Sequence, residues 1–448
     1  MRVAKTATTL VGCALALAAA ASAGQRDLGR ETLQAGDGWA SSSPGTTGGA
    51  AAALGQVYVV TNRQELVAAL NDGVYPPSNT PSNAPKIIYV DGIIDANVND
   101  ENQPLGCTDY YRNGYTLEAF LARYDPTGEW GRVNPSGELE AARVASAAAQ
   151  QARVRIRVGS NTTIVGVGKQ ATIRGAWLDL RGTATLPRTN IIIRNITFQD
   201  TYDCFPQWAP NDGALGNWNA LYDSVSLRDT DHVWIDHNRF EDVETADDTL
   251  PVHFGRLFQV HDGHLDITNA SDLVSVSWNR FLNHDKMMLI GSSDNAPLDV
   301  GNLRVTLHHN LFDGVGQRGP RVRFGQVHVY NNLYRIRKLP TYGYSWGVGV
   351  QSALYAEYNF FQVDADVTAD ELIERFNGVA LHEHGNLFDG PADRFLLDLR
   401  EAYNAVNSPD LLELDETTAA WTPTLFLEMD PARHVLPVVQ SHAGPFPW

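Results

Sequence analysis

The sequence lacks three features that would place the chain in other classes of protein. Among its 448 residues, only 3 are cysteine, and 34 lysines and arginines stand against 52 aspartates and glutamates, a net charge of −18. Nucleic-acid binders need a basic face for phosphate contacts, so this balance argues against a nucleic-acid partner. No apolar run is long enough to cross a membrane, while 43% hydrophobic residues argue against disorder. The composition is that of a folded, acidic protein without a membrane partner, and we expect a monomer.

The first residues follow the three-part pattern of a signal peptide. Arg2 and Lys5 give a positive start, residues 10–20 are apolar, and Ala21-Ser22-Ala23 has the small-x-small form of a cleavage site. An Ala-rich first helix is the alternative interpretation. We expect residues 1–23 to be a signal peptide that is cleaved near Ala23, which makes the protein secreted, either periplasmic or extracellular.

The segment after the predicted cleavage site has a linker-like composition, and export bears on the two cysteines that remain. Residues 24–55 are rich in Gly, Ala, Ser and Thr, which predicts a flexible N-terminal arm before one domain over residues 56–448. Cys13 leaves with the signal peptide, so Cys107 and Cys204 remain as an even pair in an oxidising compartment. We predict that they form a disulfide, with two buried free thiols as the alternative.

A repeated strand pattern dominates the rest of the chain. Short runs with alternating apolar residues end in Asn, one further residue and an aromatic residue, and the repeated Asn residues are Asn238, Asn279, Asn310, Asn332, Asn359 and Asn386. A repeat of 20 to 50 residues marks a solenoid. The repeated unit is a strand, without paired amphipathic helices or leucine-rich spacing, so we predict an all-β chain wound as a single-stranded parallel β-helix. An ordinary multi-sheet β-protein is the alternative.

Two long segments interrupt the early repeats. Residues 200–222 and 241–261 exceed a minimal turn, and insertions on one side of a solenoid build its working face. Short peripheral helices are expected over 62–70 and 137–151, where apolar residues recur at helical spacing.

Three carboxylates and several cations stand beside these insertions. Asp262 and Asp266 fall on one face of a strand, and Asp223 lies one turn earlier, about 4.8 Å away if the turns stack. Converging carboxylates select Ca²⁺, although solvated surface acids are the alternative. On the following turns, Lys286 and a run of arginines suggest a polyanion partner or salt bridges between turns; these arginines are Arg318, Arg321 and Arg323.

At these positions the sequence resembles the pectate lyases of polysaccharide lyase family one. The matching stretches are Val233-Trp-Ile-Asp-His237, Asp262-Gly-His-Leu-Asp266, His284-Asp-Lys286, Leu289-Ile-Gly-Ser-Ser-Asp294 and Arg318-Gly-Pro-Arg-Val-Arg-Phe-Gly325. The resemblance extends from about Val57 to Thr424, with the motifs in family order. It implies a right-handed parallel β-helix that binds Ca²⁺ and cleaves de-esterified homogalacturonan (polygalacturonate) by β-elimination.

The resemblance also implies roles for single residues. It makes Asp223, Asp262 and Asp266 the calcium ligands, Arg318 the catalytic base, and Lys286 and Arg323 the substrate-binding cations; two departures from the family pattern are Gly319, where alanine is commoner, and Leu221, where some relatives carry another acid. The second departure leaves the number of calcium ions open. Because arginine is ordinarily protonated, a base role requires neighbouring cations, and we expect an alkaline activity optimum.

Three other functions fit parts of the pattern. A pectin lyase acting on methyl esters would share the fold but would not need three converging aspartates, because its substrate lacks the charge that calcium bridges. A pectin-hydrolysing glycosidase would need two carboxylates placed as acid and base or nucleophile. A calcium-dependent polysaccharide-binding β-helix without turnover would not need the cations on consecutive turns. Trp208 and Trp218, in the first long insertion, are candidates for stacking on sugar rings.

Overall fold

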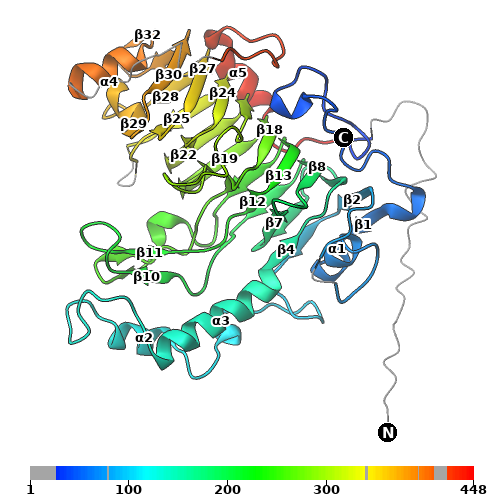
Figure 1. The fold of residues 1–448 in the computed structure, drawn as a ribbon, viewed down its shortest axis with the longest axis vertical. Helices are drawn as coiled ribbons and strands as arrows, with labels where there is room; N and C mark the ends of the chain where they lie inside the picture. Colours follow the sequence, from blue (N-terminus) through cyan, green and yellow to red (C-terminus); the bar gives the residue numbers. More distant parts are fainter. Residues whose placement is uncertain (1–26, 78–79, 339–341, 392, 408–420) are drawn as a thin grey trace.

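The computed structural model is built from three long parallel sheets that wind around one axis (Figure 1). It describes residues 27–77, 80–338, 342–391, 393–407 and 421–448. The predicted signal peptide lies outside these residues. Within them, no helix is long and apolar enough to span a membrane.

From β2 to β29, each turn of the chain contributes one strand to every sheet, in the order sheet 1, sheet 3, sheet 2. Sheet 1 comprises β1 (Val57–Val60), β2 (Lys86–Val90), β5 (Thr162–Gly166), β8 (Arg188–Arg194), β13 (Thr230–Asp236), β18 (Asp272–Ser277), β21 (Val305–His308), β24 (Gln326–Tyr330), β27 (Ala353–Glu357) and β30 (Ala380–His384). Sheet 2 comprises β4 (Arg155–Arg157), β7 (Trp177–Arg181), β12 (Val225–Arg228), β17 (Leu265–Thr268), β20 (Leu289–Ile290), β23 (Arg321–Val322), β26 (Trp346–Gly349) and β29 (Ile373–Phe376). Sheet 3 comprises β3 (Ile93–Asp95), β6 (Thr172–Arg174), β9 (Thr197–Gln199), β14 (Arg239–Glu241), β19 (Arg280–Lys286), β22 (Leu311–Gln317), β25 (Leu333–Ile336), β28 (Phe360–Val363), β31 (Leu387–Asp389) and the antiparallel β32 (Arg394–Leu396). The predicted parallel β-helix is therefore confirmed.

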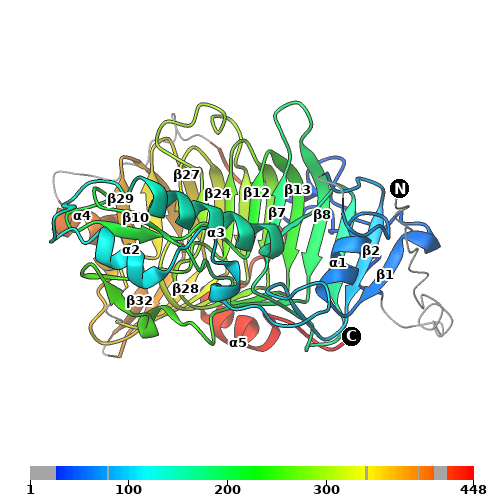
Figure 2. The same ribbon diagram turned by 90° about the horizontal axis from the view of Figure 1, so that it is seen from below.

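The longest insertions occur at one corner, where the chain passes from sheet 3 to sheet 2. The first leads from β3 to β4 and carries η3 (Cys107–Tyr110), α2 (Leu117–Arg123) and α3 (Glu138–Val154), the second carries the hairpin of β10 (Gln207–Ala209) and β11 (Asn217–Asn219), and the third carries η4 (Asp247–Thr249) and the hairpin of β15 (Val252–His253) and β16 (Arg256–Leu257). Figure 2 shows α3 running across the stacked strands. The remaining helices are η1 (Trp39–Ser41), η2 (Leu54–Gln56), α1 (Arg63–Ala69), η5 (Ala369–Leu372), α4 (Leu399–Asn407) and α5 (Ala432–His442). Insertions thus gather on one side, as the repeat lengths predict.

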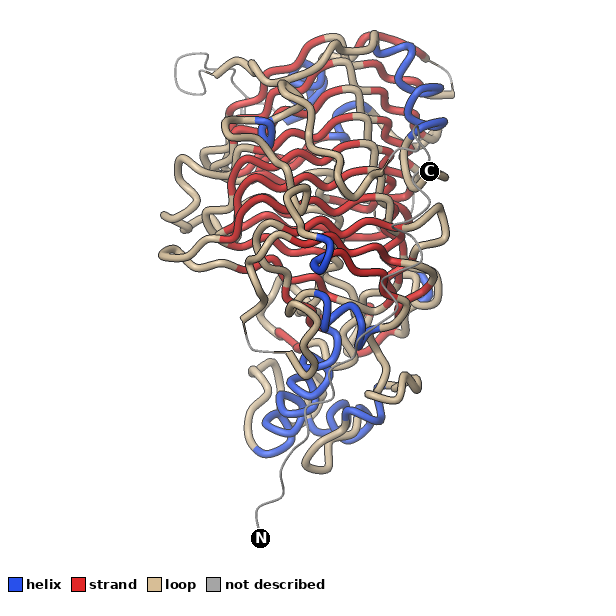
Figure 3. The backbone as a smooth tube through the Cα atoms, turned by 90° about the vertical axis from the view of Figure 1, so that its right-hand side faces the viewer, coloured by secondary structure: helices blue, strands red, loops and turns tan. Residues whose placement is uncertain are grey.

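The repeated Asn-x-aromatic ending has a physical role at the corner between sheets 1 and 3. A ladder of buried Asn side chains runs through Asn238, Asn279, Asn310, Asn332, Asn359 and Asn386. From Asn279 onward, each Oδ1 accepts hydrogen bonds from the backbone N–H and side-chain amide of the Asn one turn earlier, at 2.8–3.1 Å. Aromatic rings stack in parallel two residues further along, with centroids 4.6–5.3 Å apart from Phe198 through Phe361. The ladder and the ring stack together hold successive turns in register. Figure 3 shows these turns stacked along the axis.

The segment over 27–55 differs from the predicted flexible arm. It packs against the outer face of sheet 1, where Leu33 and Ala40 are buried and the Ala40 N–H donates to Ser275 Oγ at 3.1 Å. Its glycines permit this close approach, because a Cβ at Gly49 would lie 1.9 Å from the carbonyl oxygen of Lys86. The small residues that suggested a linker are therefore needed for packing.

We predict that removing one rung of the Asn ladder destabilises the whole domain. Asn310→Ala leaves the buried backbone N–H of Asn279 without its acceptor and should lower the free energy of unfolding by about 2–4 kcal/mol, because each buried unpaired polar group costs about 1–3 kcal/mol. Equilibrium urea denaturation measures this loss. Asn302→Ala, which removes a local bond to Leu298 outside the ladder, is the control, and equal losses in the two variants would contradict a special role for the ladder.

Candidate functional site

Parallel register brings the predicted site residues to the corner between sheets 3 and 2. Asp223 lies just before β12, and Asp262 and Asp266 lie before and within β17, which pairs with β12 through Val225 and Leu265. Lys286 is the last residue of β19, and Arg318 follows β22. Because β17, β20 and β23 are consecutive neighbours in sheet 2, the acids and the two cations lie on four successive turns of the β-helix.

The acid cluster closes over the backbone of one glycine. The Gly263 N–H donates to Asp223 Oδ1 at 2.9 Å, and the Leu289 N–H donates to Asp266 Oδ1 at 2.9 Å. A Cβ placed on Gly263 would lie 2.7 Å from Asp266 Oδ1 and 2.9 Å from Asp223 Oδ1. The two carboxylates therefore converge on a space that only glycine leaves open.

The cluster carries more negative charge than its protein neighbours neutralise. Burial raises the pKa of Asp223 well above its ordinary value, and the charges of Asp266 and Asp262 raise it further. Burial, followed by the charge of Asp262, raises the pKa of Asp266 to about 7, although Arg318 acts in the opposite direction. Buried carboxylates of this kind are stabilised as anions by a cation among them.

Arg318 lies at the edge of this cluster. Its backbone adopts φ 62°, and its buried Nε has no hydrogen-bond partner among the described residues. Burial raises the pKa of the Tyr344 hydroxyl, and the nearby charges of Arg318 and Arg321 oppose that shift. Arg318 thus stands between a carboxylate and another guanidinium, with donor capacity that the described protein groups do not use.

The other cationic side chains of the site differ in the contacts that they make within the protein. Arg323 Nε donates to Asp294 Oδ1 at 2.6 Å and its Nη1 donates to the Gly291 carbonyl at 3.0 Å, so these two bonds use two of its five N–H donors. The Arg321 guanidinium covers the ring of Phe376, 3.8 Å from its centroid. Lys286 is half-buried at the end of β19.

Several residues near the site had no assigned role in the sequence. Asp203 is fully buried, its oxygens accept from the Phe205 and Leu221 backbones at 2.8 and 3.2 Å, and burial raises its pKa to about 6. Asp242 and His284 are also buried, and His284 Nδ1 lies 2.6 Å from Asp242 Oδ2. His284 belongs to the His-Asp-Lys motif, whereas no sequence pattern marks Asp203 or Asp242.

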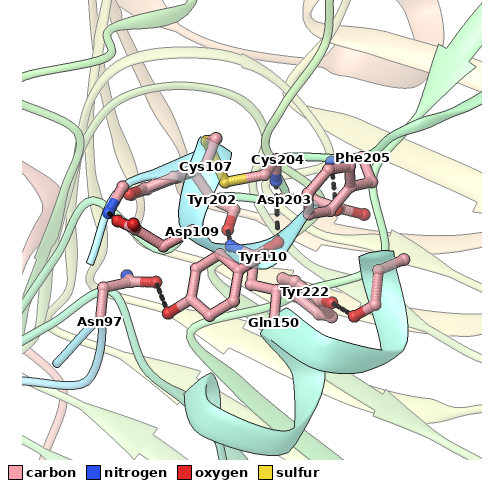
Figure 4. The surroundings of a disulfide bond; sticks show 12 residues. Asn97, Cys107, Asp109, Tyr110, Gln150, Tyr202, Asp203, Cys204, Phe205 and Tyr222 are labelled. Atoms are coloured by element: carbon pink, nitrogen blue, oxygen red, sulfur yellow. Dashed lines mark hydrogen bonds between the residues drawn. A yellow bond between two sulfur atoms is a disulfide. The ribbon is translucent and has the colours of Figure 1, made fainter. Parts of the chain in front are cut away.

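The first insertion is held by the predicted disulfide. Cys107 and Cys204 are bonded, with Cα atoms 5.4 Å apart, and link η3 to the segment before β10 (Figure 4). The Cys204 N–H also donates to Gln150 of α3 at 2.9 Å. Trp208 and Trp218, in the hairpin of the second insertion, lie in a core that the insertions share and are 1% and 2% exposed, so neither presents a face for stacking on a sugar.

Comparisons with known proteins agree with this arrangement. The sequence profile described as pectate lyase matches residues 132–400. A curated pectate lyase of Bacillus subtilis (strain 168) is 41% identical over 427 residues, covering 95% of each chain, and pectate lyase E of Dickeya dadantii (strain 3937) is 35% identical over 396 residues, covering 86% of this chain and 83% of the relative.

Solved structures give the same result. The thermostable pectate lyase PL 47 superposes with a TM-score of 0.88 at 45% identity, covering 94% of this chain and 99% of that one. A pectate lyase bound to a hexasaccharide superposes with a TM-score of 0.85 at 40% identity, with the same coverage. From the profile, the relatives and the shared right-handed β-helix, the chain belongs to the pectate lyase family.

Proposed function

We propose that the protein is a secreted, calcium-dependent pectate lyase that cleaves de-esterified homogalacturonan by β-elimination, with Arg318 as the base. The observation that carries this proposal is the position of Arg318, whose charge acts on Asp266 at the edge of an under-neutralised acid cluster. A uronate polymer carries one carboxylate on every sugar, so it complements cations that lie beside a metal site.

The acid cluster fits a calcium ion better than it fits the protein's own cations. Asp223, Asp262 and Asp266 would hold the ion through carboxylate oxygens, the ligands that Ca²⁺ prefers, and Gly263 leaves the space between two of them open. Bound calcium would supply positive charge that offsets both these carboxylates and that of the substrate.

The chain's own residues perform the elimination. Arg318, in the neutral form that alkaline pH and neighbouring cations favour, takes the C5 proton next to the uronate carboxylate. The electron pair forms the C4–C5 double bond, and the glycosidic C4–O bond breaks. Lys286 and the remaining N–H donors of Arg323 hold substrate carboxylates and stabilise the negative charge that develops as the proton leaves. The leaving oxygen takes up a proton as the unsaturated oligogalacturonide departs.

Export is consistent with the covalent structure of the described residues. The Cys107–Cys204 disulfide is typical of an oxidising compartment. The signal peptide over 1–23 remains a prediction, tested by the N-terminal sequence of the protein recovered outside the producing cell.

The activity is tested by ultraviolet absorbance during incubation with polygalacturonate. We expect the absorbance of unsaturated products to grow with added calcium and to stop with a chelator, because the acid cluster holds the ion only when it is supplied. Methyl-esterified pectin is the matched substrate control. A faster rise in absorbance on methyl-esterified pectin without calcium would indicate a pectin lyase. Cleavage of glycosidic bonds without a rise in ultraviolet absorbance would indicate a hydrolase.

Arg318→Lys should lower kcat about 10²- to 10⁴-fold, the usual contribution of a positioned proton-transfer group. Calcium affinity, measured by titration calorimetry without substrate, should be unchanged because the carboxylates are intact. Arg337→Lys, which alters an exposed arginine paired with Asp313, is the matched control. Retained turnover in Arg318→Lys would assign the base elsewhere, and a pH–rate profile that peaks below neutrality would equally count against an arginine base.

Gly263→Ala should weaken calcium binding while the fold remains intact. The added Cβ would come within 3.0 Å of carboxylate oxygens of both Asp223 and Asp266 and force them apart. We expect at least a tenfold rise in the calcium dissociation constant, about the effect seen for disturbed metal sites. Gly55→Ala, whose Cβ would meet open space, provides the comparison, and equal calcium affinity in the two variants would refute convergence on one ion.

A further inference from the structure

The third insertion begins and ends beside one buried histidine. It leaves sheet 3 at Asp242, directly after β14, and returns to sheet 2 through Asp262, shortly before β17. His284 lies in β19 on the following turn, only 3% exposed, and Lys286 is two residues further along the same strand. The strand that carries Lys286, a proposed substrate-binding residue, therefore also passes the two ends of the insertion that carries Asp262.

His284 binds both ends of this loop. Its Nδ1 lies 2.6 Å from Asp242 Oδ2, and its Nε2 lies 2.8 Å from the backbone carbonyl oxygen of Asp262. A carboxylate and a carbonyl both accept hydrogen bonds, so the imidazole donates from each nitrogen. One further contact joins the same strand to the loop, because the Asp285 N–H donates to Asp247 Oδ2 at 2.8 Å.

A transition-metal site does not explain this cluster. One donor atom each from Asp242, His264 and His284 lies within 4.8 Å of the others. However, the rings of His264 and His284 stack with centroids 3.8 Å apart and planes 23° apart. The nitrogen lone pairs lie in those nearly parallel planes, so the two rings do not direct them at a common ion.

We propose that His284 is a positioning residue that fixes Asp262 relative to Lys286. By holding the Asp262 carbonyl, it sets the backbone from which the Asp262 carboxylate projects toward Asp223 and Asp266, and Asp242 holds the imidazole in place. This inference rests on the proposed role of Asp262 as a calcium ligand. Partners behind a metal ligand commonly change metal affinity 10- to 100-fold when they are removed.

Two amide variants separate the two hydrogen bonds. The side-chain amide of asparagine reaches the position of Nδ1, so His284→Asn can keep the bond to Asp242 but loses the bond to Asp262. The longer glutamine reaches the position of Nε2, so His284→Gln can keep the bond to Asp262. We expect His284→Asn to raise the calcium dissociation constant about tenfold or more and His284→Gln to retain most of the affinity.

The measurement is calcium titration by calorimetry without substrate, followed by kcat at saturating calcium. A positioning role predicts that excess calcium restores kcat in His284→Asn toward the wild-type value, whereas a purely structural role predicts a loss that calcium does not restore. His308→Asn is the matched control, because His308 is likewise buried, lies on sheet 1 away from the site, and contacts an aspartate, Asp37 of the N-terminal segment. Its calcium affinity should equal that of the wild type.

The outcomes distinguish this inference from the proposed function. Equal calcium affinity in the wild type and His284→Asn, or equal losses in the Asn and Gln variants, would overturn the positioning role while leaving the lyase intact. A wild-type chain that binds no calcium would overturn both. If His284→Asn does not fold, Asp242→Asn gives the same test from the other side of the ring and should weaken calcium binding more than His308→Asn does.

Discussion

The site depends on carboxylates from different turns that parallel register brings together. Asp223 and Asp266 belong to different turns, yet both place an oxygen within 3.0 Å of one point above Gly263. Burial raises the pKa of both carboxyls, and the charge of a neighbouring aspartate raises each further. The β-helix holds each backbone in place, and the calcium ion that we propose would relieve the repulsion between the carboxylates.

The contacts that make the β-helix rigid lie at a different corner from the candidate site. The Asn ladder and the stacked rings lie at and next to one corner, while the insertions and the site lie at another. The repeating corner fixes the spacing between turns, which leaves the opposite corner free to vary in length and composition. Three successive kinds of group can therefore follow one another along the axis: the acids, Lys286 and the arginines.

Much of the fold could be predicted from the sequence, because a repeated Asn-x-aromatic ending is a local pattern with one structural use. The N-terminal segment could not, since Gly-rich composition is shared by linkers and by chains that approach a sheet closely, as Gly49 does. The disulfide could be predicted because an even number of cysteines remains in a protein expected in an oxidising compartment. The burial of Trp208 and Trp218 was not, because the insertion has a core of its own.

The site shows the same division. The positions of Asp223, Asp262, Asp266 and Arg318 follow from motifs, and the structure brings them to one corner. Contacts that join residues of different turns leave no such mark: Asp242 contacts His284, 42 residues away in the sequence, and Asp203 comes from the second insertion. Residues that act through their neighbours are visible only once the register is known.

The most direct test of this account is a crystal structure of the Arg318→Lys variant with calcium and an oligogalacturonate. The account predicts an ion about 2.3–2.6 Å from oxygens of Asp223, Asp262 and Asp266, with one uronate held between that ion and the side chain at position 318. An ion bound elsewhere, or a sugar chain that lies away from this corner, would contradict it.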